Sequence, residues 1–180
     1  MKKIISLFLL LAFGFSGCEK DDICDANTPT TPRLVLTFYF ADQPTVLKPV
    51  TSLKVYGEGQ DATKGIIFNE TAITDELKYT TNASKILIPL DPSKDSVTYH
   101  FISNFSTTNP ALQNDDILKF TYTRENVYVS RACGFKTIYK LNTSVERLGG
   151  ENINTYWMKN INVITPNIES ENETHVEVFF

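Results

Sequence analysis

Hydrophobic and polar residues alternate along much of the chain after residue 33. Leu34, Leu36 and Phe38, for example, are each separated by one residue. Successive side chains of a strand point to opposite faces, so this alternation predicts strands with one buried face. The same pattern predicts further strands at residues 53–56, 65–68, 85–90, 96–103, 118–123, 127–133, 135–141, 160–165 and 175–180.

Turn-forming residues separate these segments at short intervals, and no amphipathic helical pattern stands out. Arg124-Glu125-Asn126 is interpreted as a hairpin turn between two of the strands. Many short strands with turns between them are typical of two packed sheets. The sequence therefore predicts an all-β fold in a single domain, residues 33–180: an antiparallel β-sandwich, either immunoglobulin-like or transthyretin-like.

The first 18 residues have a different pattern. Lys2-Lys3 is followed by an apolar stretch at residues 4–15, which is shorter than the roughly 18 residues needed to span a bilayer. The small residues Ser16-Gly17 then precede Cys18. This arrangement resembles a bacterial lipoprotein signal peptide with its lipobox. It predicts removal of residues 1–17 and acylation of Cys18; a plain signal peptide followed by a cysteine is the alternative.

The segment after Cys18 is charged and then rich in proline. Residues 18–32 are interpreted as a lipidated tether, stiffened by Pro29 and Pro32. Lys20-Asp21-Asp22 resembles the lysine-plus-two-acids export signal of surface lipoproteins in the Bacteroidota. It predicts an outer-membrane protein that faces the outside of the cell. If the tripeptide is only a solvated spacer, the domain faces the periplasm instead.

The charge balance limits the classes of partner. The whole chain has a formal net charge of −4. Removal of the signal peptide also removes Lys2 and Lys3, so the mature chain has a net charge of −6. A net negative chain argues against nucleic acid, whose phosphates need clustered basic residues. It also argues against electrostatic docking of the whole domain to anionic lipid. The predicted membrane attachment is therefore the lipid on Cys18.

The chain has three cysteines: Cys18, Cys24 and Cys133. With Cys18 acylated, an even pair remains in an oxidising compartment, which favours a Cys24–Cys133 disulfide. Such a bond is expected to attach the start of the domain to a central strand. Two buried free thiols are the alternative. A zinc site is disfavoured because the spacing fits no zinc motif and only His100 and His175 are available to complete it.

Candidate catalytic or ligand-binding residues are few. His100 lies on the polar face of a predicted strand and His175 lies in the acidic tail, and neither is accompanied by a nucleophile and an orienting acid. Asn114-Asp115-Asp116 is favoured as a polar turn over a calcium site. Tyr156-Trp157 is favoured as packing over a stacking platform for a sugar or peptide. No catalytic residue, metal site or cofactor is predicted.

Two stretches carry a family resemblance. They are Cys18-Glu-Lys-Asp-Asp-Ile-Cys24, which leads into residues 28–34, and residues 122–139 around Cys133. Together they resemble small lipoproteins of flavobacteria-type Bacteroidota that carry a domain of unknown function. The resemblance implies a β-rich exported domain with the paired cysteines, and it implies no activity.

Two classes of function remain after these exclusions. The first is a cell-envelope lipoprotein without enzymatic activity, which binds an envelope protein or a glycan or serves as an accessory part of a complex. The second is a small hydrolase of extracellular polymers, which requires two carboxylates at a fixed separation in a cleft. The sequence identifies no such pair and therefore favours the binding or accessory module.

Overall fold

The computed structural model describes residues 23–24, 28, 30–149 and 156–180, and these residues form two β-sheets. The smaller sheet has four strands, in the order β4 (Lys85–Ile88), β1 (Leu34–Tyr39), β11 (Val176–Phe179) and β9 (Asn160–Val163). The larger sheet has seven, in the order β10 (Asn167–Ile168), β7 (Gly134–Leu141), β6 (Asn114–Ser130), β5 (Ser96–Ser103), β2 (Leu53–Gly57) and β3 (Thr80–Thr81), with β8 (Glu146–Leu148) paired to β6. The predicted all-β, two-sheet fold is confirmed.

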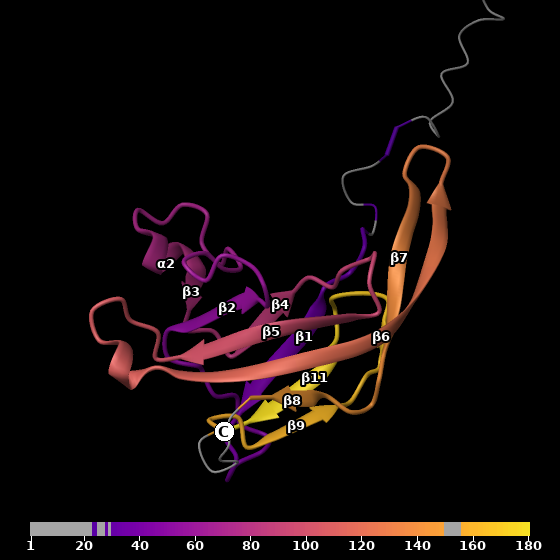
Figure 1. Cartoon of the computed structure of the whole chain (residues 1–180). Helices are drawn as coiled ribbons and strands as arrows, with labels where there is room; N and C mark the ends of the chain where they lie inside the picture. Colours follow the sequence, from indigo (N-terminus) through magenta and orange to yellow (C-terminus); the bar gives the residue numbers. More distant parts are fainter. Residues whose placement is uncertain (1–22, 25–27, 29, 150–155) are drawn as a thin grey trace, which may run out of the picture.

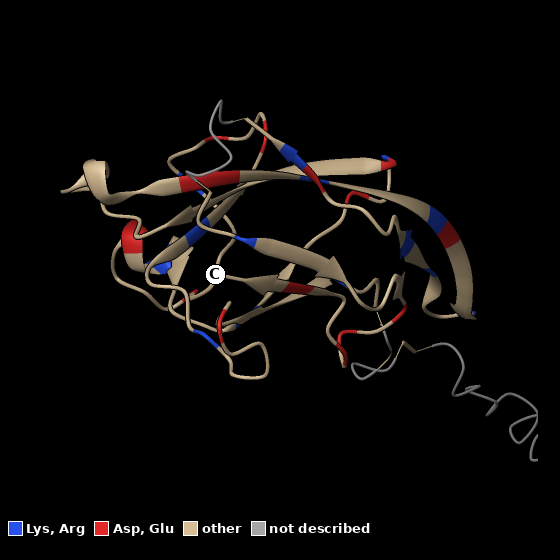
Figure 2. Ribbon diagram, turned by 90° about the horizontal axis from the view of Figure 1, so that it is seen from below, with Lys and Arg blue, Asp and Glu red and all other residues tan. Residues whose placement is uncertain are grey.

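The two sheets face each other as layers (Figures 1 and 2). Side chains from β1, such as Leu36 and Phe38, meet side chains from the larger sheet, such as Phe101 and Phe120, and all four are fully buried. Burial of a side chain of this size stabilises the fold by about 1.5–3 kcal/mol. The alternation along each strand therefore gives the sandwich its core.

Neighbouring strands are antiparallel except for β1 and β11. These two strands lie near opposite ends of the described chain and pair in parallel, with Leu36 opposite Val176 and Phe38 opposite Val178. Strand β1 is central in its sheet and is buried on both faces, because Val35 and Thr37 are also inaccessible to solvent. The start of the domain is therefore part of its core.

Strand β6 corrects the predicted hairpin. Arg124, Glu125 and Asn126 lie within this 17-residue strand and pair with β7, so they form no turn. The turn lies instead between Ser130 and Gly134, where Gly134 has a positive φ of 70° that suits glycine. The polar triplet is compatible with a strand because its side chains are exposed to solvent.

The outer part of β6 and β7 projects from the sandwich as a two-stranded arm (Figure 1). We call residues 127–136 the arm tip. Cys133 lies in the turn of this tip, so the prediction that it occupies a central strand is wrong. The N-terminal segment runs beside the arm, and Thr31 Oγ1 accepts a hydrogen bond from the backbone N–H of Thr137.

Three further differences concern the connections between strands. Residues 65–68 were predicted as a strand but form a loop, held to β2 by one backbone hydrogen bond from Ile66 to Val55. A short helix, α2 (Asp75–Tyr79), and a 3-10 turn, η2 (Pro110–Leu112), also interrupt the strands. Among the described residues, none of the helices has the length and hydrophobicity required to traverse a bilayer.

Candidate functional site

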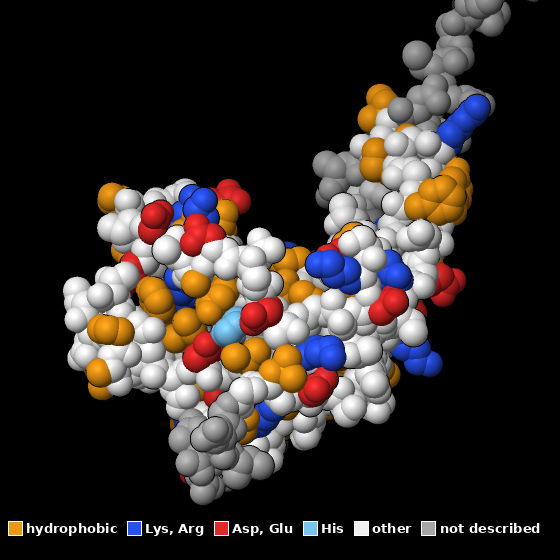
Figure 3. Space-filling model, viewed as in Figure 1, with side chains coloured by type: hydrophobic (Ala, Val, Ile, Leu, Met, Phe, Trp, Pro, Cys, Tyr) orange, Lys and Arg blue, Asp and Glu red, His pale blue; other side chains and the backbone are white. Residues whose placement is uncertain are grey.

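A cleft of about 880 Å³ lies at one end of the sandwich. One wall is the loop after β2, residues 57–67, and the other is the connection between β4 and β5, residues 89–96. In Figure 3 the molecule is hollowed between the lobe around α2 and the base of the arm, where these walls lie. A cleft of this size is in the range of small-molecule and peptide sites.

The first wall is fixed to β2 by a buried lysine and a glycine. Lys54 is only 2% exposed, and its Nζ donates hydrogen bonds to the carbonyl oxygens of Ala62 and Thr63. Burial lowers the pKa of Lys54, and the nearby Asp61 opposes this shift. A Cβ on Gly65 would lie 2.7 Å from the Val55 carbonyl oxygen, so only glycine allows the loop to approach β2 this closely.

The second wall is held by three tyrosines from the larger sheet. Tyr99 Oη donates to the Pro89 carbonyl at 2.7 Å, and Tyr139 Oη donates to the Leu90 carbonyl at 3.3 Å. Tyr122 Oη accepts from the Asp91 N–H and donates to the Asp91 carbonyl, both at 3.0 Å. Burial raises the pKa of Tyr122 to about 12, so these hydroxyls stay protonated and continue to donate.

The charged groups of the cleft are mostly committed to local partners. Hydrogen bonds from the hydroxyl and N–H of Thr63 lower the pKa of Asp61, and those of Ser93 lower the pKa of Asp91. Arg33 forms a bidentate pair with Glu171 at 2.7 Å for both contacts. The cleft therefore presents ionised groups of both signs beside aliphatic and aromatic side chains.

A cluster around His100 adjoins the cleft through Tyr56 and Glu58. His100 lies on the outer face of β5, as predicted, with Nδ1 2.7 Å from Asp115 and Nε2 2.5 Å from Glu58. Its ring stacks on Tyr56 with centroids 4.4 Å apart. Burial alone lowers the pKa of His100, but the two carboxylates outweigh this effect and raise it. The histidine on the face in Figure 3 is flanked by acidic side chains.

The Asn114-Asp115-Asp116 triplet forms neither the turn nor the calcium site considered for it. It begins β6, and alternation sends Asp115 to the outer face and Asp116 to the core. The Asp116 carboxylate accepts hydrogen bonds from the backbone N–H groups of Trp157 and Met158, and burial raises its pKa. Within residues 23–24, 28, 30–149 and 156–180, no group of three His, Cys, Asp or Glu side chains is placed to hold a metal.

Trp157 is part of the core, as favoured from the sequence. It is 9% exposed, stacks near Phe38 and donates from Nε1 to the Phe101 carbonyl. His175 is fully buried, at the start of β11. Neither residue faces the cleft, so neither contributes to a binding surface there.

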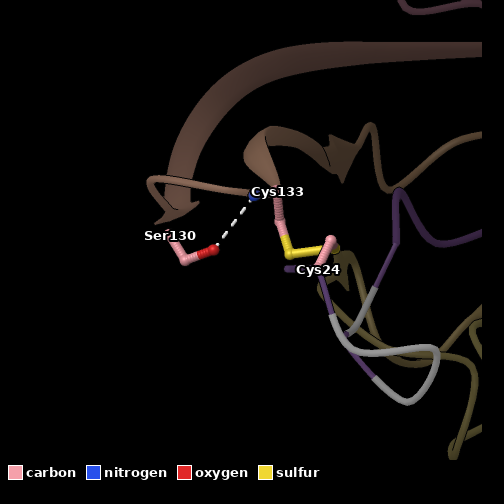
Figure 4. The surroundings of a disulfide bond; sticks show 3 residues. All are labelled: Cys24, Ser130 and Cys133. Carbon is pink, nitrogen blue, oxygen red and sulfur yellow. Dashed lines mark hydrogen bonds between the residues drawn. A yellow bond between two sulfur atoms is a disulfide. The ribbon is translucent and has the colours of Figure 1, made fainter. Parts of the chain in front are cut away.

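The structure joins Cys24 and Cys133 in a disulfide, with their Cα atoms 5.0 Å apart (Figure 4). Ser130 Oγ accepts a hydrogen bond from the backbone N–H of Cys133 and closes the turn at the arm tip. The bond spans 109 residues and ties the N-terminal segment to the arm. The free-thiol and zinc alternatives do not hold in this structure.

The remaining site predictions lie outside the described residues. They concern acylation of Cys18 and the export signal at Lys20, Asp21 and Asp22. The predicted boundaries of the signal peptide and the lipidated tether likewise stay predictions.

Sequence reasoning did not identify the cleft or its supports. Tyr99, Tyr122 and Tyr139 lie at inward-facing positions of three strands, and they looked like ordinary core residues. Their hydroxyl groups were the available signal, because a buried tyrosine hydroxyl needs a hydrogen-bond partner. The hydrogen-bond partners of the three hydroxyls all lie in the connection between β4 and β5, residues 89–91. The strand order brings this connection next to the tyrosines, and the sequence alone does not show it.

Comparison with known proteins gives a family but no activity. A family of unknown function (DUF6452) matches residues 52–180. No curated protein and no solved structure matches the chain, so the finer likeness to immunoglobulin-like or transthyretin-like domains stays a prediction. The matched range begins after β1, although β1 is central in its sheet. Because the match covers well over half of the 180 residues, the chain belongs to this family of unknown function.

Proposed function

We propose that this protein is a lipid-anchored component of a bacterial cell envelope and that its β-sandwich is a binding or accessory module without enzymatic activity. The observation that carries the proposal is the cleft of about 880 Å³ with two fixed walls. Lys54 supports one wall, and Tyr99 and Tyr122 support the other. A preorganised cleft loses little conformational entropy when a ligand binds.

The chemistry of the cleft favours binding over hydrolysis. A glycosidase-like pair needs one carboxyl group with a raised pKa to act as the general acid. Asp61 and Asp91, which line the cleft, instead have lowered pKa values. The described carboxyl group with a raised pKa is Asp116, and both of its oxygens accept hydrogen bonds from the backbone in the core.

The proposed location rests on the N-terminal sequence and on the disulfide. Lys2-Lys3, the apolar stretch and Cys18 favour export followed by acylation. The Cys24–Cys133 disulfide fits an oxidising compartment. Lys20-Asp21-Asp22 favours the outer leaflet of the outer membrane, facing the outside of the cell. The partner is then an envelope protein or a glycan rather than nucleic acid.

Site-specific photo-crosslinking in intact cells tests the binding role. A benzoylphenylalanine at Ile67, which lines the cleft, is compared with one at Ile164, which lies outside it; both side chains are 48% exposed. We expect a discrete crosslinked product from position 67 and none from position 164. Equal labelling at the two positions contradicts the role of the cleft.

A hydrolysis assay tests the alternative function directly. The purified chain is incubated with envelope polysaccharides and peptides, beside Asp61→Asn and Asp91→Asn variants. We expect no release of products by any of the three proteins. Release that is lost in either variant overturns the non-enzymatic proposal.

A further inference from the structure

The arm lacks the support that the rest of the larger sheet receives. Strand β5 pairs with β6 only as far as Thr121, so the outer halves of β6 and β7 pair mainly with each other. A two-stranded hairpin is marginally stable in water on its own. This one is supported by the disulfide to Cys24 and by the hydrogen bond between Thr137 and Thr31. These two supports come from the N-terminal segment that follows Cys18, and Lys136 Nζ adds a hydrogen bond to the Glu169 carbonyl oxygen at 3.3 Å.

The arm tip is apolar and basic. Tyr128 and Phe135 are 58% and 69% exposed, and their rings contact each other with centroids 5.5 Å apart. Ile23, next to the disulfide, is 80% exposed. Residues 127–136 include Arg131 and Lys136 and no acidic residue, although the chain as a whole is acidic. In Figure 3, hydrophobic and basic side chains gather toward the end of the arm.

The disulfide sets how far this tip lies from the predicted lipid. Cys24 is six positions after Cys18, and a fully extended chain over six positions spans at most about 20 Å. Without the disulfide, the ion pair of Arg33 with Glu171 still attaches the chain to the domain; Arg33 is fifteen positions after Cys18, which allows about 50 Å. The cross-link therefore keeps the arm tip near the membrane surface.

We propose that the arm tip docks into the headgroup region of the same membrane leaflet that holds the lipid on Cys18. This inference rests on the acylation included in the proposed function. Tyrosine favours the membrane interface, where apolar and polar surroundings meet, and phenylalanine is suited to burial at the boundary between headgroups and acyl chains. Arg131 and Lys136 belong to the same tip and supply positive charge for anionic headgroups. Because the whole chain carries a negative charge, insertion of Phe135 and Tyr128 supplies the attraction and the two cations assist it.

Docking at the tip fixes the orientation of the domain. The arm then acts as a second contact beside the acyl chains, and two contacts hold a domain on a membrane more firmly than one. The cleft lies between the lobe around α2 and the base of the arm, so docking of the tip also sets how the cleft is oriented relative to the bilayer.

Depth-dependent fluorescence quenching tests the proposal on the full acylated chain. The protein is extracted in detergent and reconstituted into vesicles of phosphatidylethanolamine and phosphatidylglycerol with brominated acyl chains. Phe135→Trp is compared with Leu112→Trp, because Leu112 is 64% exposed but lies in η2, away from the arm. The native Trp157 is buried and gives a constant background.

We expect the added emission of Phe135→Trp to shift to shorter wavelength and to lose most of its intensity in brominated vesicles. The emission of Leu112→Trp should keep both its wavelength and its intensity. Adding Cys24→Ser to Phe135→Trp should weaken the quenching, because the attachment lengthens from about 20 Å to about 50 Å.

The outcomes separate this inference from the proposed function. Vesicle-bound, acylated Phe135→Trp that is quenched no more than Leu112→Trp overturns the docking of the tip and leaves the lipid anchor intact. If the tryptophan at position 135 is shielded from water in native membranes but not in protein-free vesicles, a protein covers the tip. That result also overturns docking of the tip to lipid. An intact mass without lipid on Cys18 overturns both proposals.

Discussion

His175 and Val35 form a reciprocal hydrogen-bonded pair where β1 meets the start of β11. The backbone N–H of Val35 donates to His175 Nδ1, and the backbone N–H of His175 donates to the Val35 carbonyl, both at 3.0 Å. The imidazole thus takes the place of a backbone acceptor in the parallel ladder. Nδ1 accepts only when that nitrogen is unprotonated, so the pair requires a neutral His175.

This pair predicts loss of stability in mild acid. Burial lowers the pKa of His175 below its usual value, so the unfolded chain binds a proton before the folded chain does. Its stabilising contribution is present above pH 6.5 or so and is lost as the pH falls from there through the folded-state pKa. Urea unfolding at pH 7.5 and pH 5.0 measures the change.

His175→Gln is the matched control for that experiment. Its amide oxygen can accept the Val35 N–H but does not titrate, so its stability should fall less between the two pH values. We expect it to be less stable than the parent at pH 7.5, by about 1–3 kcal/mol, as for other altered buried polar groups. If the unfolding free energies of the two proteins fall equally between pH 7.5 and pH 5.0, protonation of His175 is not the cause of the loss.

His100 should respond in the opposite direction. Asp115 and Glu58 raise its pKa, so its contribution is fully present below about pH 6.5 and is lost as the pH rises through the folded-state pKa. Titration of the imidazole by NMR should show Asp115→Asn lowering the pKa more than Glu58→Gln. The reason is that Glu58 is 60% exposed and Asp115 is 35% exposed, so solvent screens Glu58 more. A larger effect from Glu58→Gln argues against this geometry.

The tyrosine supports of the cleft should differ in strength. Tyr122→Phe removes two hydrogen bonds to Asp91, whereas Tyr139→Phe removes one bond of 3.3 Å. We expect losses of unfolding free energy of about 1–3 kcal/mol and about 0.5–1.5 kcal/mol, respectively, because the buried partners lose their donors or acceptors. Urea denaturation compares them directly, and a larger loss for Tyr139→Phe is the contrary result.

The cysteine variants should be equivalent to each other. Cys24→Ser and Cys133→Ser remove the same link across 109 residues, so each should lower the unfolding free energy equally, by up to about 4–5 kcal/mol. Hydrogen exchange should also rise at the arm tip in both variants. If the two variants lose unequal amounts of unfolding free energy, or if hydrogen exchange rises first in the core strands, the disulfide does not act mainly on the arm.

The strand pattern was predictable because alternation reports a buried face, as at Leu34, Leu36 and Phe38. The turn was misplaced because Arg124-Glu125-Asn126 is polar, and polarity cannot distinguish a turn from a strand exposed to solvent. Gly134, three positions after Arg131, was the stronger signal because it allows a positive φ. Local composition therefore predicts elements better than it predicts where they connect.

The candidate site was harder to predict because its parts are distant in the sequence. Alternation places Lys54 on the opposite face of its strand from Leu53 and Val55, yet Lys54 is buried because the loop at residues 57–67 covers it. The tyrosines meet residues 89–91 only after β5, β6 and β7 are assembled. The cysteine pairing was accessible by counting, since the chain offers few thiols.

Lipid anchoring and the disulfide are tested together by the intact mass of the mature protein, extracted from membranes in detergent without reductant. We predict a chain that begins at Cys18, carries acyl chains on that residue and has an intact Cys24–Cys133 disulfide. Cys18→Ser should leave the precursor uncleaved or release the protein from the membrane. A water-soluble mature protein that begins at another residue and carries no lipid contradicts the account.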